Sequence, residues 1–140
     1  MTLVDHWGEV PLSMNYLAAK NDVPKRFLEH IMLDLKEQGW VESSPGRKGG
    51  YVLAMAPERI TMGQVVRHFD GLMAPIGCVS VNRNEPCTQA GLCRFRRVFL
   101  DIRNLTANYL DNTTLAQITA TVPVGDHEIF ALELVAGDGI

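Results

Sequence analysis

All three cysteines of the chain, Cys78, Cys87 and Cys93, lie in one segment rich in Pro, Gly and Asn, with the spacing C-x8-C-x5-C. Thiols gathered in this way could bind a metal or undergo oxidation. The spacing lacks the C-x2-C pairs of zinc knuckles and of redox-active dithiols. A long irregular segment suits a cofactor larger than one tetrahedral ion, and thiolates are the usual ligands of iron–sulfur clusters. Zinc binding and oxidation of bare thiols are the alternatives.

Three arginines, Arg94, Arg96 and Arg97, follow the last cysteine in the first turn of a predicted helix. Cations are normally unfavourable there because the N-terminal end of a helix dipole is positive. A cluster held by three thiolates carries net negative charge and would offset both the arginines and the dipole. Alternatively, these arginines pair with Asp101 or Asp111, or contact DNA phosphates.

Length and composition fit one folded domain, since 46% of the 140 residues are hydrophobic and 21% are charged. No apolar run reaches the roughly 20 residues of a membrane helix, and the N-terminus lacks a signal-peptide pattern. We therefore expect a cytoplasmic protein with no membrane partner. An odd cysteine count argues against a disulfide framework. The sequence shows no nucleophile–base pair or phosphate loop, which argues against an enzyme. The net charge of −3 means that nucleic acid would need a local basic patch.

Two helices joined by a short turn precede the cysteine segment. Residues 13–20 predict a short helix with Ser13 as its N-cap. Residues 24–38 predict a longer helix that ends at Gly39. Apolar residues at helical spacing predict the buried stripe of this second helix, formed by Phe27, Leu28, Ile31, Met32 and Leu35.

A hairpin follows the second helix. Short strands are predicted at 40–42 and 51–53, joined by the turn SSPGRKGG. The glycines of this turn, at positions 46, 49 and 50, are free to adopt positive φ. Two helices followed by a hairpin with a basic tip form the plan of a winged helix-turn-helix.

This plan predicts which side chains contact DNA. Residues near the N-terminus of the second helix contact base edges, and here these are Lys25, Arg26 and His30, with Arg26 best suited to bidentate contact with guanine. At the hairpin tip, three residues can contact phosphates or the minor groove, namely Arg47, Lys48 and Gly49. Basic residues on a helix are usually only a solvated surface, so the order of the elements carries the prediction of double-stranded DNA as partner.

The second half of the chain is predicted to be mainly helical. A helix capped by Thr61 ends at Gly71, the cysteine segment spans 72–93, and a long helix covers 94–110. The long helix has one continuous apolar face, formed by Phe95, Val98, Phe99, Ile102, Leu105 and Tyr109. This face is too long for a monomer of this size to cover, so the sequence predicts a homodimer that binds a palindromic operator.

The fold class is therefore mainly α with a small β-hairpin wing, in one domain. Its parts are a winged helix-turn-helix at 1–71, the cysteine segment at 72–93, and a dimerisation helix with a short following helix at 94–118. The tail, 119–140, shows little helical pattern and is not assigned a structure or a role.

The residues FLEHIMLDLKEQGWVESSPGRKGGYVLA resemble the recognition helix and wing of the Rrf2 family of bacterial regulators, including its wing signature G-x-x-G-G-Y. The residues ITMGQVVRHFDG and LDNTTLAQI resemble the helices that follow, so the similarity covers roughly 4–118. Two features depart from the family pattern. The chain is expected to lack most of the first helix, and Pro45 stands where family members often carry a basic residue.

The resemblance implies a cofactor and its ligands. Cluster-binding members carry three cysteines before the long helix, and Cys78, Cys87 and Cys93 match them by position. In the family the fourth ligand is a histidine just after the third cysteine or a side chain of the first helix. Arg96 and Arg97 occupy the first place, and only Asp5 and His6 remain for the second. The cluster type, 2Fe–2S or 4Fe–4S, stays open.

These observations together predict a repressor whose DNA binding is controlled by an iron–sulfur cluster that senses redox state, nitric oxide or iron. The first alternative is a cluster-free winged-helix regulator controlled by thiol oxidation or by a partner protein. A small iron–sulfur electron carrier is a third interpretation, but it gives no reason for a basic glycine-rich wing.

Overall fold

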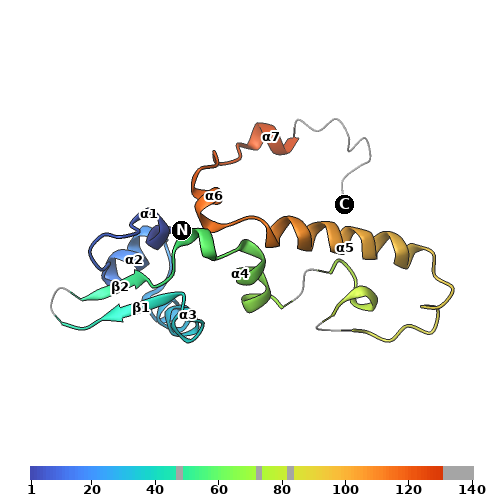
Figure 1. Ribbon diagram of the computed structural model, residues 1–140, viewed down its shortest axis with the longest axis horizontal. Coiled ribbons are helices and arrows are strands. Elements are labelled where there is room, and N and C mark those ends of the chain that lie inside the picture. The colour runs from blue at the N-terminus through green and yellow to red at the C-terminus, as the bar shows by residue number, and fades with distance from the viewer. Residues whose placement is uncertain (47–48, 72–73, 82–83, 131–140) are drawn as a thin grey trace.

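The computed structural model of the chain describes residues 1–46, 49–71, 74–81 and 84–130 (Figure 1). It is mainly helical with one two-stranded antiparallel sheet, which confirms the predicted fold class. A winged helix-turn-helix forms one end of the molecule, and the long helix α5 extends away from it (Figure 1). Among the described residues, no helix is long and apolar enough to cross a membrane. The elements are, in order, α1 (Thr2–Asp5), α2 (Met14–Lys20), α3 (Lys25–Glu37), β1 (Val41–Ser44), β2 (Gly50–Leu53), η1 (Pro57–Arg59), α4 (Met62–Phe69), η2 (Gly77–Val79), α5 (Phe95–Asp111), α6 (Leu115–Thr119) and α7 (Asp126–Phe130).

Local signals set the ends of the helix-turn-helix. The Oγ of Ser13 accepts a hydrogen bond from the amide of Tyr16 at 3.2 Å, which caps α2 as predicted. Gly39 has φ +70° and follows the end of α3, which confirms it as the stop signal. On α3, Leu28 and Met32 are buried against the core. The predicted stripe is wrong at Phe27, whose side chain is 58% exposed.

The wing is a regular hairpin whose strands pair Val41 with Leu53 and Ser44 with Gly50. β1 begins one residue later than predicted because the amide of Trp40 instead donates to the carbonyl of Leu35, at the end of α3. Each strand runs beyond its predicted range at the turn side, so the hairpin is longer than the sequence suggested. Strand ends are the least certain part of any prediction from pattern, since fraying and pairing decide them.

The main core lies within the winged helix-turn-helix. It joins residues from α1, α2, α3, both strands and the connections before β1 and before α4, namely Val4, Leu17, Leu28, Met32, Trp40, Val41, Leu53 and Ile60. Ile60 is only 1% exposed. An apolar cavity of ≈ 350 Å³ opens beside this core, and the residues lining it include Met1, Val4, Met32 and Val65.

The helices of the second half begin with well-formed caps. Thr61 and Gln64 form a capping box at α4, and Thr114 and Gln117 form a second one at α6. Residues 126–130 form a short helix, α7, in the tail that the sequence left without assigned structure, and residues 131–140 of the tail lie outside the described residues.

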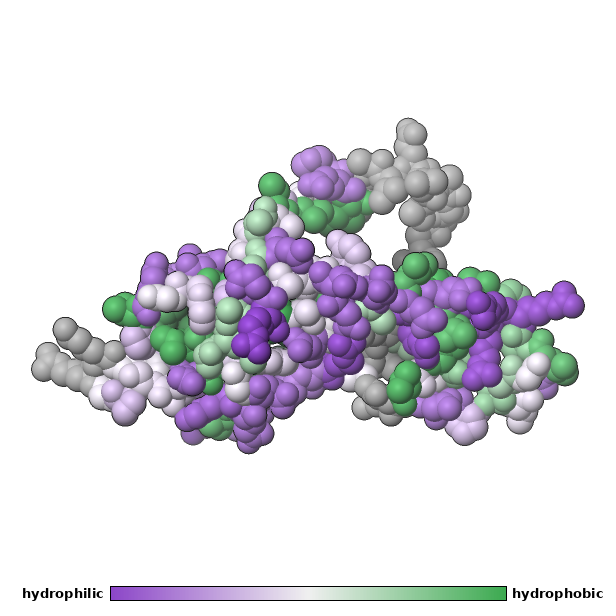
Figure 2. Space-filling model, viewed as in Figure 1, coloured by the Kyte–Doolittle hydropathy of each residue, from purple (hydrophilic) through white to green (hydrophobic). Residues whose placement is uncertain are grey.

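Two opposite faces of α5 have different surroundings. The inward face packs against η2 and α4. The outward face carries apolar side chains at alternating three- and four-residue spacing, and these are largely exposed in the single chain: Phe95, Val98, Ile102, Leu105 and Tyr109. The space-filling view shows apolar surface at the end of the molecule that contains α5 and the cysteine segment (Figure 2).

Candidate DNA interface and cysteine site

The predicted base-contacting residues share the first half of α3. Lys25, Arg26 and His30 are all exposed, and Lys25 is the first residue of the helix. Arg26 and His30 are four residues apart, so their side chains lie on the same face one turn from each other. This face is opposite the buried residues Leu28 and Met32. Its cations can therefore enter a DNA groove without disturbing the core.

Phe27 adds an apolar side chain to this exposed surface. Its exposure of 58% is high for an aromatic residue that lies next to the buried Leu28. An exposed aromatic side chain at the start of a recognition helix can contact the methyl group of thymine in the major groove. Phe27 was predicted to be buried because it is apolar. Its position at the edge of the apolar stripe, about 100° around the helix from Leu28, was the indication that its side chain is exposed.

The wing tip is described only in part. Arg47 and Lys48, the predicted phosphate contacts, lie outside the described residues. Gly49 has its amide 2.9 Å from the carbonyl oxygen of Gly46, and a Cβ at Gly49 would lie 2.1 Å from the carbonyl oxygen of Ser44. The turn therefore requires glycine at 49 for close backbone approach. Of the three wing glycines, only Gly46 has positive φ, so the predicted reason for Gly49 and Gly50 is wrong.

The structure brings two of the three cysteines to one pocket. Cys78 in η2 and Cys93 just before α5 are half-buried and line a pocket of ≈ 360 Å³. Cys87 is exposed and is not among the residues that line it. All three are free thiols. Within the described part of the chain, no group of three His, Cys, Asp or Glu side chains is arranged to hold a metal ion.

Three arginines of α5 line this pocket, and two of them donate hydrogen bonds to the backbone of η2. The Nε of Arg96 donates to the carbonyl of Cys78 at 3.2 Å, and Nη1 of Arg103 donates to the carbonyl of Val79 at 2.6 Å. Arg97 also lines the pocket and pairs with Asp101 at 3.3 Å along the helix, which is one of the two pairings considered from the sequence. The pocket thus combines two thiols with three cationic side chains.

The chemical types of these residues fit an iron–sulfur cluster, but the three cysteines are not brought together as ligands. Thiols are the correct donor type, and the arginines would offset the negative charge of a thiolate-bound cluster. Cys87 would have to join the other two, which this conformation does not show. Asp5 ends α1 and His6 follows it, at the other end of the molecule from η2 and the start of α5, so neither can complete the site within one chain (Figure 1).

The fold and the exposed basic helix define a winged helix-turn-helix DNA-binding protein. A sequence model of the Rrf2 family, described as "Iron-dependent Transcriptional regulator", matches residues 1–121. The chain belongs to this family, which confirms the resemblance seen in the sequence. Members of the family are transcriptional regulators that bind DNA and are not enzymes.

Individual relatives agree with this assignment. An rrf2-like HTH-type transcriptional regulator of Rhodobacter capsulatus is 38% identical over 112 residues, which cover 78% of this chain and 75% of the relative. The HTH-type transcriptional repressor NsrR of Streptomyces coelicolor is 30% identical, over 84% of this chain and 77% of the relative. The structure of CymR, described as the global cysteine regulator of B. subtilis, superposes with a TM-score of 0.69 and 30% identity, covering 87% of this chain and 88% of that one.

Proposed function

We propose that this chain is a homodimeric repressor, acting in the cytoplasm, whose binding to a palindromic operator is controlled by an iron–sulfur cluster. Cys78, Cys87 and Cys93 would ligate the cluster, and loss or damage of the cluster would report redox state, nitric oxide or iron supply. The observation that carries the proposal is the pocket in which two free thiols face three arginines.

When bound, the cluster would supply a redox-active and oxygen-sensitive group. The protein's own residues prepare for it in distinct ways. Arg96 and Arg103 of α5 hold the backbone at Cys78 and Val79 in η2. The thiol of Cys78 therefore has a defined position relative to α5. Cys87 lies in the described stretch 84–94, which contains no helix or strand, so it can approach the two pocket cysteines without unfolding a helix.

The DNA-binding part of the proposal rests on α3 and the wing. Lys25, Arg26 and His30 would contact base edges, and Phe27 a thymine methyl. The chain has a net charge of −3, so this local basic surface has to supply the attraction to phosphates. Arg47, Lys48 and Gly49 would contact the DNA backbone beside the helix.

The outward face of α5 supports the homodimer. Its five exposed apolar residues follow the three–four spacing of a helix that packs along a partner helix. Pairing two copies across a two-fold axis would cover this face and present two α3 helices to successive turns of a palindromic site.

A cluster-free regulator controlled by thiol chemistry is the second candidate. Two observations favour it: the three cysteines are not assembled as ligands, and CymR of Bacillus subtilis is 32% identical over 88% of this chain and 82% of the relative. In this case oxidation of the exposed Cys87, or a partner protein, would provide the signal.

Anaerobic purification separates the two candidates. We expect brown protein with iron and sulfide in equal amounts, and operator affinity that changes when the cluster is lost. Cys87→Ala should abolish iron and sulfide binding, whereas Thr88→Ala, at the exposed neighbouring position, should not. Colourless wild-type protein whose DNA affinity responds to peroxide but not to iron would support the thiol-controlled candidate and exclude the cluster.

A further inference from the structure

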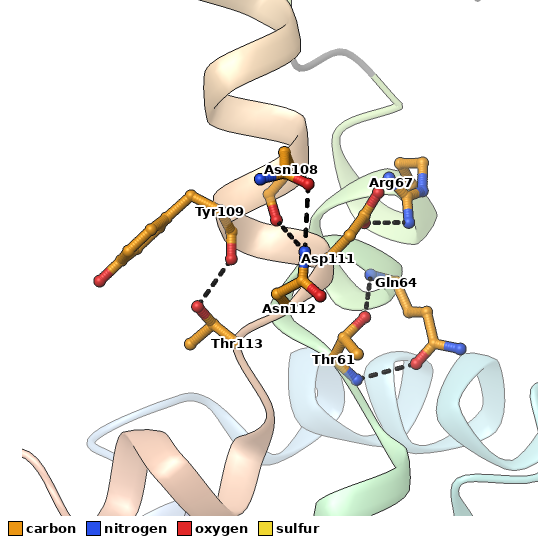
Figure 3. A network of polar contacts seen from close by, with 8 residues as sticks. All are labelled: Thr61, Gln64, Arg67, Asn108, Tyr109, Asp111, Asn112 and Thr113. Carbon is orange, nitrogen blue, oxygen red and sulfur yellow. Dashed lines mark hydrogen bonds and ion pairs between the residues drawn. The ribbon is translucent and has the colours of Figure 1, made fainter.

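An ion pair between Asp111 and Arg67 joins the end of α5 to α4. The Oδ1 of Asp111 lies 2.5 Å from Nη2 of Arg67, and the two residues are 44 positions apart in sequence. Both side chains are partly exposed, and an ion pair of this kind contributes little stability by itself. Figure 3 shows Asp111 pointing from the end of α5 toward α4, where Arg67 receives it.

Gly63 is shaped to accept the same carboxylate. It is buried on α4, one turn before Arg67, and a Cβ at this position would lie 2.0 Å from Oδ1 of Asp111 and 3.1 Å from its backbone nitrogen. No other residue could occupy position 63 without displacing Asp111. Gly63 and Arg67 therefore both contact the side chain of Asp111 from α4. We call Gly63, Arg67 and Asp111 the α4–α5 joint.

Backbone hydrogen bonds fix the joint to the winged core. The amide of Met62 donates to the carbonyl of Thr113 at 2.8 Å, and the amide of Leu115 donates to the carbonyl of Ile60 at 2.9 Å. Ile60 belongs to the most buried part of the core. The segment that follows α5 is thus held against the segment that precedes α4, so the two helices cannot separate without breaking these bonds.

The joint lies on a continuous path between the cysteine pocket and the recognition helix. On the pocket side, Arg96 and Arg103 tie η2 to α5. On the DNA side, the ring of His68 in α4 meets the edge of the buried Trp40 at 5.6 Å between centroids. The amide of Trp40 donates to the carbonyl of Leu35 in α3 at 3.0 Å. Packed side chains, hydrogen bonds and helices of this kind can carry energetic coupling between two distant sites.

We propose that Asp111, Arg67 and Gly63 couple the cysteine pocket to the recognition helix, acting as positioning residues for DNA binding. The inference deepens the proposed function, because it names how a change at the cysteines would alter operator affinity. Coupling between two sites is reciprocal, so operator binding must also change the environment of the cysteines. This reciprocity gives a test that needs no bound cluster.

The test measures thiol alkylation in the reduced apoprotein. The rates of iodoacetamide modification at Cys78, Cys87 and Cys93 are followed by mass spectrometry, with and without a duplex enriched from a random library by in vitro selection. In the wild type, saturating duplex should change the rates at Cys78 and Cys93 about fivefold or more. Cys87, which lies outside the pocket, serves as the internal reference.

Asp111→Asn is the informative variant, and Asp126→Asn is its control because it removes the same charge from an exposed residue of α7 that belongs neither to the joint nor to the cysteine pocket. We expect the DNA-dependent change at Cys78 and Cys93 to fall to near unity in Asp111→Asn at saturating duplex, and to persist in Asp126→Asn. Arg67→Met provides a second variant if Asp111→Asn unfolds, and Arg67→Lys should restore part of the coupling.

Two outcomes would overturn the inference. One is a wild-type DNA effect that survives in both Asp111→Asn and Arg67→Met, which would place the coupling elsewhere. The other is a wild type in which DNA leaves the reactivity of Cys78 and Cys93 unchanged. Failure of the proposed cluster is distinguishable from both, since it appears as absent iron and sulfide in anaerobic protein whatever the alkylation rates show.

Discussion

The two halves of this molecule differ in how far they bury their apolar side chains. The winged helix-turn-helix has its own core, with Ile60 and Val41 among the most buried side chains. The long helix α5 contains no buried residue in the single chain and exposes a row of apolar side chains instead. The first half thus supplies the buried residues of its own core, against which Leu115 of α6 also packs, and we call it the self-sufficient half. In our proposal, the second half is completed by a second chain and by a cofactor.

The largest expected effect is a loss of stability in the self-sufficient half. Met32 is 2% exposed, and Met32→Ala should lower the free energy of unfolding by about 2–5 kcal/mol because it leaves a cavity in the core. The neighbouring Leu33 is exposed on the same helix, so Leu33→Ala should change it by roughly 0.5 kcal/mol or less. Urea unfolding followed by circular dichroism measures both. Equal effects at the two positions would contradict the described packing of α3.

The next effect should appear in the second half, which in our proposal pairs with a second chain. Leu105 is 71% exposed in the single chain, yet Leu105→Asp should weaken the proposed dimer by about 2 kcal/mol or more, since it would place a charge in an apolar interface. Sedimentation equilibrium should then show monomers at concentrations where the wild type is dimeric. Asn104→Asp adds the same charge to α5 at an exposed position that is three or four residues from no member of the apolar row, and it should leave the dimer intact. A dimeric Leu105→Asp protein would exclude this face as the interface.

The sequence predicted the first half better than the second because its signals are local. Ser13, Gly39 and the Thr61–Gln64 pair each fix a helix end through contacts within a few residues. Phe27 was misplaced because apolar character alone does not decide burial at the edge of a stripe.

The candidate site depends on contacts that no local pattern encodes. The meeting of Cys78 with Cys93, and of Asp111 with Gly63, requires segments distant in sequence to fold together. The family resemblance indicated that all three cysteines act together, but the chain's own packing brings only two of them to the pocket.

A third prediction concerns the exposed face of the first half. Arg26→Ala should weaken binding to the selected duplex by about 1–3 kcal/mol and relax its sequence preference at one position, because a bidentate base contact is lost. Lys20→Ala, at the end of α2, removes the same charge outside the proposed interface and should have a smaller effect that does not depend on sequence. Fluorescence anisotropy against the selected duplex and single-base variants measures both. Uniform weakening across all duplexes would show that Arg26 contacts phosphate rather than a base.

The smallest predicted effect concerns the packing of the self-sufficient half. This half also contains a cavity, so the contrast in burial between the two halves is not complete. Val65 lines that cavity of ≈ 350 Å³, whereas the next residue of α4, Val66, does not. Val65→Leu adds one methylene to an apolar space that can hold it, and should raise the free energy of unfolding by roughly 0.8 kcal/mol. Val66→Leu makes the same change in helix propensity without filling the cavity, so the difference between the two variants isolates the packing contribution. Thermal unfolding should give Val65→Leu the higher Tm of the pair. If the order is reversed, another group already fills this space, and the core of the first half is complete.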